Sequence, residues 1–249
     1  MKNNLEIYFS SISYYFTNKK NKLVYLILLI GVLVPAFSGS STTNFWFRLY
    51  NIFGSSFLWF SFFLAVGISS LNSFELYFKN YNIYNRYSDF KSLVKKYILD
   101  ISMFTTILYV SLLIFSIAGA LMFSYNNFTT YLYQEYNINI VIYIIFKIIT
   151  NYIFSILVNI IVYSLPFVLK KFEIICLVLL NCFTFQLPSL RSSINHFYEM
   201  PFLYHEYFSS LKCSSFLLEL ICNLFMILTL FLFNNLVYYI VTRKKRDVC

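Results

Sequence analysis

Six long stretches without a charged residue constrain what this chain can fold into. They cover residues 23–47, 49–74, 101–134, 148–169, 174–190 and 220–242. A helix that crosses the hydrocarbon core of a bilayer needs about 20 apolar residues, so each stretch is long enough for one span. We therefore predict six transmembrane helices, near residues 23–38, 52–71, 98–123, 148–168, 172–188 and 217–240.

The composition agrees with a lipid environment. Apolar residues make up 59% of the chain and charged residues 12%, whereas a soluble domain carries about 25% charged residues. This deficit argues against an ordinary cytosolic enzyme, a disordered chain and a nucleic-acid-binding domain. Apolar runs such as residues 23–30 do not alternate with polar residues, as the strands of a membrane β-barrel would. The predicted fold class is an all-α integral membrane protein.

The positive charges predict which face of the membrane each segment occupies. Six spans place both termini on one face, and 15 of the 19 Lys and Arg residues belong to segments on that face. The other face receives Arg48, Arg191 and Lys212. Because short cytoplasmic loops carry the excess of Lys and Arg, we expect a multi-pass protein of the plasma membrane with cytoplasmic termini. This topology and attraction to anionic lipid account for the net charge of +9 without a nucleic-acid partner.

Three regions organise the chain around these spans. Residues 1–22 are predicted to hold an amphipathic helix in the membrane interface, or else an extension without a role. Residues 23–241 form the six-span domain, and residues 242–249 form a basic cytoplasmic tail. Within the domain, the outer loop 189–212 fits either two short helices that dip into the outer leaflet or a plain aromatic interfacial loop.

The cytoplasmic loop 76–97 has the pattern of a helix with one apolar and one basic face. It contains neither Gly nor Pro, and its apolar residues recur at helical spacing, at Ile83, Tyr84, Tyr87, Phe90, Leu93 and Val94. Such a helix can insert into a groove on a soluble partner. It can equally lie flat on anionic headgroups.

The sequence offers no residues for catalysis, for a cofactor or for a metal. None of the five glycines is followed by Lys, so the loop that cradles nucleotide phosphates is absent, and any ATP would bind to a different chain. The five cysteines form no C-x-x-C pair. His196 and His205 share the outer loop with two glutamates, but their spacing does not match that of zinc hydrolases. We therefore predict that the chain is not itself an enzyme.

Two ionisable residues are predicted at span edges, at similar depth near the outer interface. Lys147 precedes the fourth span and Glu219 lies in the sixth. Charges in lipid tend to pair or to face a polar path, so these two residues are either an intramembrane pair or two side chains that reach separately for the headgroups. Polar residues of the second and sixth spans either line an internal path or form hydrogen bonds between helices, and they are Ser55, Ser56, Ser61, Asn223, Thr229, Asn234 and Asn235.

The order of these segments resembles the permease subunit of type 2 ABC exporters, in its small six-span class. The shared features are an amphipathic N-terminal helix, two spans, a basic cytoplasmic helix and four further spans. The most specific local similarity is an Arg-aromatic-Ser segment with basic residues a few positions later, which fits Arg86, Tyr87, Lys91 and Lys95. Asp89 and Leu93 depart from this pattern, because basic or aromatic residues are common at those positions.

The resemblance implies a function and a set of partners. Two such chains, identical or different, would pair around a central path. Each would contact a separate ATP-binding subunit through residues 79–96 and the N-terminal helix, with Arg86, Tyr87, Lys91 and Lys95 as coupling residues. The outer loop before the sixth span would close the exit. Export of an antimicrobial peptide or another amphipathic molecule is the expected activity by analogy. Two alternatives remain open, namely a membrane-embedded binding or immunity protein without a transport cycle, and an intramembrane enzyme.

Overall fold

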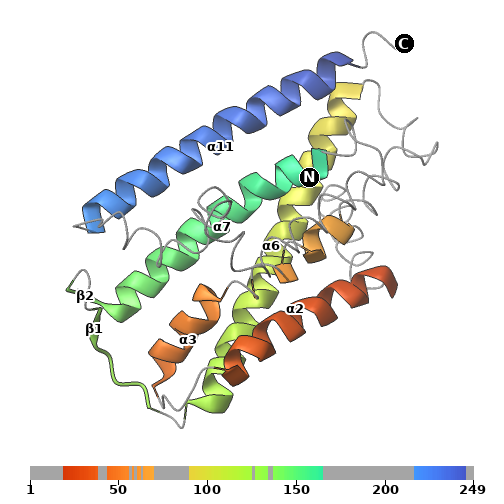
Figure 1. Cartoon of the computed structure of the whole chain (residues 1–249). Coiled ribbons are helices and arrows are strands. Elements are labelled where there is room, and N and C mark those ends of the chain that lie inside the picture. Colours follow the sequence, from red (N-terminus) through yellow and green to blue (C-terminus); the bar gives the residue numbers. More distant parts are fainter. Residues whose placement is uncertain are drawn as a thin grey trace, which may run out of the picture.

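In the part of the chain that the structure describes, five named helices and one short hairpin pack into a bundle. The computed structural model describes residues 19–38, 44–55, 58, 61, 62, 64–69, 90–124, 127–133, 137–164 and 216–244. The elements in this part of the chain are α2 (Lys19–Ser38), α3 (Phe45–Gly54), α6 (Phe90–Phe123), β1 (Leu132–Tyr133), β2 (Ile138–Asn139), α7 (Ile140–Ser164) and α11 (Phe216–Lys244). Helix α6 packs against α2, α3 and α7, and α7 in turn packs against α11 (Figure 1).

Three of these helices are long and apolar enough to cross a membrane. They are α6, the part of α7 over Ile140–Val162, and the part of α11 over Glu219–Arg243. Helix α2 contributes a shorter apolar segment, Lys22–Phe37. The described part of the chain is thus predominantly helical and is compatible with an all-α membrane protein. The predicted N-terminal helix before residue 19, the first part of the 76–97 loop, the fifth span and the outer loop 189–212 lie outside the described residues.

Several element boundaries differ from those predicted. Helix α6 begins at Phe90, so residues 90–97, which the sequence pattern assigns to the cytoplasmic loop 76–97, are the first two turns of the same helix as the predicted third span. Helix α7 begins at Ile140, and Lys147 therefore lies two turns inside it. Both differences arise because a charge-free stretch marks the part of a helix that suits lipid, while the helix itself continues past that part.

The charge-free stretch 49–74 does not contain one helix that begins near residue 52. Instead α3 ends at Gly54, and Ser55 is extended (φ −74°, ψ 124°). Helical residues are described again at 58, 61, 62 and 64–69, and they include the buried Phe62, Ala65 and Val66. A break of this kind requires no charge, so the charge pattern does not reveal it.

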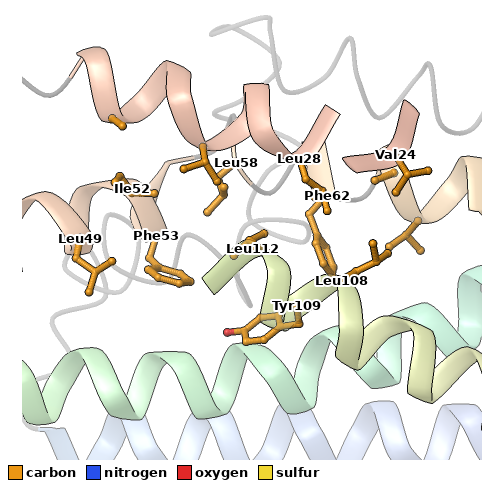
Figure 2. Packing of buried hydrophobic residues seen from close by; sticks show 14 of the residues in the cluster. Val24, Leu28, Leu49, Ile52, Phe53, Leu58, Phe62, Leu108, Tyr109 and Leu112 are labelled. Atoms are coloured by element: carbon orange, nitrogen blue, oxygen red, sulfur yellow. The ribbon is translucent and has the colours of Figure 1, made fainter. Parts of the chain in front are cut away.

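The hydrophobic core lies between α2, α3, α6 and the described residues 58, 61, 62 and 64–69. Figure 2 shows Leu28 of α2 near Phe62, with Leu108 and Tyr109 of α6 on the other side of that ring. The Phe62 and Tyr109 rings meet edge to face at 6.4 Å. Close approach depends on Gly31 of α2, where a Cβ atom would lie 2.5 Å from the Ser61 Cβ.

Arg48 stabilises the end of α2 at this core. Its Nη1 donates a 2.9 Å hydrogen bond to the carbonyl oxygen of Ala36, one of the last carbonyls of α2, which have no partner within their own helix. The Arg48 guanidinium also lies 5.6 Å from the centroid of the Phe123 ring. The arginine is buried, and it therefore joins α3 to the ends of α2 and α6.

The start of α3 is tied to the loop that follows α6. Asn44 caps α3 by accepting a 3.1 Å hydrogen bond from the Phe47 amide. Its Nδ2 donates to the Thr129 carbonyl oxygen at 2.7 Å, and the Phe45 amide donates to the Asn127 carbonyl oxygen at 2.8 Å. Strands β1 and β2 then pair antiparallel, with Leu132 opposite Asn139, and lead directly into α7.

Candidate functional site

The most distinctive polar feature is a buried ion pair between α7 and α11. The ammonium of Lys147 on α7 contacts the carboxylate of Glu219 on α11. The Glu219 side chain is fully buried, and the Lys147 side chain is 14% exposed. The sequence placed these residues at one depth and left two possibilities open, pairing or separate contacts with the headgroups. In the structure the two side chains come together.

Local structure favours a carboxylate at this position. Glu219 lies in the first turn of α11, where the helix dipole and the free backbone amides stabilise negative charge. Lys147 lies two turns into α7, a position from which its long side chain reaches the neighbouring helix. The two charges therefore neutralise each other where the first turn of α11 meets α7.

Tyr143 completes the polar part of this site. It lies one turn before Lys147 on α7, and its hydroxyl is 3.4 Å and 3.5 Å from the two carboxylate oxygens of Glu219, to which it donates. The Lys147 Nζ lies 5.4 Å from the centroid of the Tyr143 ring, a distance at which an aromatic face attracts a cation. A tyrosine thus contacts both members of the pair.

Aromatic rings surround the pair. Phe216 packs on Phe146 at 5.0 Å and on Tyr143 at 6.5 Å, and Tyr50 of α3 lies 6.2 Å from Tyr143. Such walls lower the local dielectric, which strengthens the attraction within the pair and raises the cost of separating it. The ion pair can therefore hold α7 and α11 together. Alternatively, Lys147 or Glu219 can leave its partner and pair with a charged group of another molecule.

The structure describes two of the four predicted coupling residues, Lys91 and Lys95. Lys91 and Lys95 occupy the first turns of α6 and are exposed. Lys96, by contrast, forms an ion pair with the buried Asp100 one turn later in α6, with 2.6 Å between Nζ and Oδ1. Arg86 and Tyr87 lie outside the described residues.

Several basic residues of α6 and α11 lie at one end of the bundle. The start of α6 lies near the ends of α7 and α11 (Figure 1). A small cavity between them is lined by Tyr97, Ile160, Ser164, Asn234 and Tyr238, among others. Lys91, Lys95 and Lys96 on α6 and Arg243 on α11 are at this end, which we call the basic end. The Lys147–Glu219 pair lies toward the opposite end, near the starts of α7 and α11.

Three of the polar residues named in the predicted sixth span form hydrogen bonds to helix backbones. Asn234 donates from Nδ2 to the Leu157 carbonyl oxygen of α7 at 2.9 Å. Asn223 and Thr229 donate to carbonyl oxygens one turn earlier in α11. Within the described ranges, His, Cys, Asp and Glu side chains form no group of three or more that could hold a metal.

Sequence reasoning missed two features of this region. It did not identify Tyr143, because tyrosines are common throughout the chain and nothing local distinguishes this one. It also missed a pattern that was visible, namely polar residues every four positions along α7, from Lys147 through Asn151 and Ser155 to Asn159. That spacing places all four on one side of the helix.

Comparison with known proteins does not assign this chain to a family. No protein-family model matches the chain, and neither a curated protein nor a solved structure matches it significantly.

Proposed function

We propose that this chain is the membrane subunit of an ATP-driven exporter, with six spans and with ATP hydrolysis on a separate protein. Three long apolar helices, the apolar segment of α2 and the two remaining charge-free stretches support the six-span arrangement. The distribution of Lys and Arg supports cytoplasmic termini in the plasma membrane. The absence of a phosphate-binding loop from the sequence is the reason for assigning the ATPase to a partner.

The length and charge of α6 carry this proposal. Its 34 residues measure about 51 Å at 1.5 Å per residue, whereas the hydrocarbon core is about 30 Å thick. The helix therefore extends beyond the core, and its first turns present Lys91 and Lys95 to solvent. A rigid helix with a basic, solvent-facing end and a buried apolar body can transmit force from a soluble motor into the bundle.

The partners and the cargo follow from the same reasoning and from the family resemblance. A second copy or a related permease would complete the path, and anionic lipid would contact the basic end. The resemblance favours an amphipathic substrate such as a peptide, moved out of the cell. A binding or immunity protein without a transport cycle would lack a stoichiometric ATPase partner, which makes co-purification the discriminating experiment.

The experiment compares charge reversal with charge conservation on α6. The full chain is purified in mild detergent from its own cells, and proteins that accompany it are identified and quantified. We expect an ATP-binding subunit in near-stoichiometric amount with the wild type and with K91R/K95R, and at least tenfold less with K91E/K95E. Absence of any ATP-binding protein from the wild-type sample contradicts the proposed function. Equal recovery with K91E/K95E contradicts the coupling role of α6 alone.

A further inference from the structure

The polar side of α7 continues from Lys147 deep into the bundle. Asn151, Ser155 and Asn159 follow Lys147 at intervals of four residues, and all three are buried. Contacts with both neighbours define where this side lies. Asn159 donates from Nδ2 to the Thr105 hydroxyl of α6 at 3.0 Å, while Lys147 reaches Glu219 of α11. The polar side therefore runs along the junction of α6, α7 and α11.

Ser155 differs from most hydroxyl residues of these helices. Ser102, Ser111, Thr150 and Ser164 each donate to the carbonyl oxygen one turn earlier in their own helix, which is how an isolated hydroxyl is satisfied in an apolar setting. The Ser155 hydroxyl is fully buried, yet it has no hydrogen-bond partner among the described residues. A buried hydroxyl that does not use its own helix indicates a polar partner from elsewhere.

Two side-chain amide oxygens near the same junction are also buried without a hydrogen-bond partner among the described residues. Asn159 and Asn234 each donate from Nδ2, to Thr105 and to the Leu157 carbonyl oxygen respectively. Their Oδ1 atoms are buried and accept no hydrogen bond from the part of the chain that the structure describes. Asn234 also lines the small cavity at the basic end. Polar atoms without a hydrogen-bond partner among the described residues thus lie between the middle of α7 and that cavity, at Ser155, Asn159 and Asn234.

Water is the molecule that fits this spacing. Ser155 and Asn159 are four residues apart, so they are separated by about 6 Å along the helix axis. One water molecule can bridge such a gap with two hydrogen bonds, and buried water is stable where two to four polar partners converge. In a membrane, polar groups that face the interior of a bundle mark the paths of polar solutes.

We propose that Asn151, Ser155 and Asn159 line a hydrated path between α6, α7 and α11. The path leads from the Lys147–Glu219 pair toward the cavity at the basic end, and it holds water molecules that bind to these three side chains. The presence of water is a property of the bundle alone and does not depend on the proposed export function.

Thiol reactivity tests the path without knowledge of the substrate. All five native cysteines are replaced, and single variants S155C and I153C are made in the full chain in its own membrane. A permanently charged methanethiosulfonate reacts with thiolates, which form in water and not in lipid. Ile153 is 37% exposed on the surface of the bundle, so a dry bundle in lipid protects both cysteines. A hydrated path instead exposes the buried position and leaves the surface position protected.

We expect S155C to react at least ten times faster than I153C, and N151C to behave like S155C. If the S155C variant is not produced in the membrane, N151C provides the same test of the buried side of α7. The inference is overturned if both path variants react no faster than I153C. This outcome is separable from the co-purification test, because an ATPase partner can be present without a hydrated α7 face, and water can be present without an ATPase partner.

Discussion

The carboxylate of Glu219, in the first turn of α11, is fully buried and is held by the ammonium of Lys147, two turns into α7. Tyr143 donates to the same carboxylate from one turn earlier on α7. Two of the three long apolar helices are thus joined by charge at one end, while Asn234 joins them again farther along α11 through a hydrogen bond to Leu157. Of these two contacts between α7 and α11, the one at Glu219 involves formal charges, so removal of one of its side chains leaves the other charge buried without a partner.

Neutralising one member of the pair is expected to destabilise the protein more than removing both charges. Loss of one partner from a buried pair costs about 3–5 kcal/mol, because the other charge stays buried without compensation. We therefore expect K147M and E219Q each to lower the thermal unfolding temperature in detergent more than the double variant does. Wild-type stability of either single variant would show that the pair contributes nothing.

Exchange of the two charges provides the matched control for this prediction. The variant K147E/E219K restores a pair of opposite charges, but it places a cation at the first turn of α11, where the helix dipole disfavours it. Partial recovery of stability and of whatever function the single variants lose is expected. If the exchanged variant is no better than the single variants, attraction between these two side chains is not what matters.

Gly31 is predicted to tolerate no side chain. A Cβ at this position would lie 2.5 Å from the Ser61 Cβ, and overpacking of this kind costs about 1–3 kcal/mol. Gly119 of α6 is the control, since a Cβ there would meet Ala36 and Val32 at 3.4 Å, an ordinary contact distance. Thermal unfolding should therefore show a loss for G31A and little change for G119A. Equal effects would mean that α2 does not approach Ser61 so closely.

Asn44 is expected to contribute through two separable interactions. Its Oδ1 caps α3 by accepting from Phe47, and its Nδ2 donates to the Thr129 carbonyl oxygen. Loss of an N-cap costs about 1 kcal/mol. N44D keeps the cap and loses the donor, whereas N44A loses both, so unfolding temperatures should fall in the order wild type, N44D, N44A. An N44D variant as unstable as N44A would assign the whole effect to the contact with Thr129.

The charge-free stretches predict the apolar parts of the helices well and their ends poorly. The sixth stretch falls within the apolar part of α11, whereas the third and fourth stretches only overlap the apolar parts of α6 (Phe90–Phe123) and α7 (Ile140–Val162). Lys91, Lys95 and Lys96 nevertheless belong to α6, because a helix that leaves the hydrocarbon region carries charge without penalty. The end of α3 at Gly54 involves no charged residue and is set by backbone geometry, with Ser55 extended.

The candidate site could be predicted in part, because depth in a membrane can be derived from sequence. The sequence predicts Lys147 and Glu219 at one depth and leaves two possibilities open, an intramembrane pair or separate contacts with the headgroups, and the structure shows the pair. The contributions of Tyr143 and Arg48 depend on which helices are neighbours and on the direction of single side chains. That information is tertiary, and no periodicity in one chain contains it.

Coupling to a cytoplasmic ATPase requires that the helices cross a membrane with the basic end in the cytoplasm. The direct measurement uses a cysteine-free chain with a single cysteine at Thr130, in the exposed loop after α6, or at Arg243, exposed near the end of α11. A thiol reagent that cannot cross membranes is applied to intact cells and then to permeabilised cells. We predict that T130C reacts in intact cells and that R243C reacts only after permeabilisation. Reaction of R243C in intact cells would contradict the orientation, the coupling role of α6 and the proposed function together.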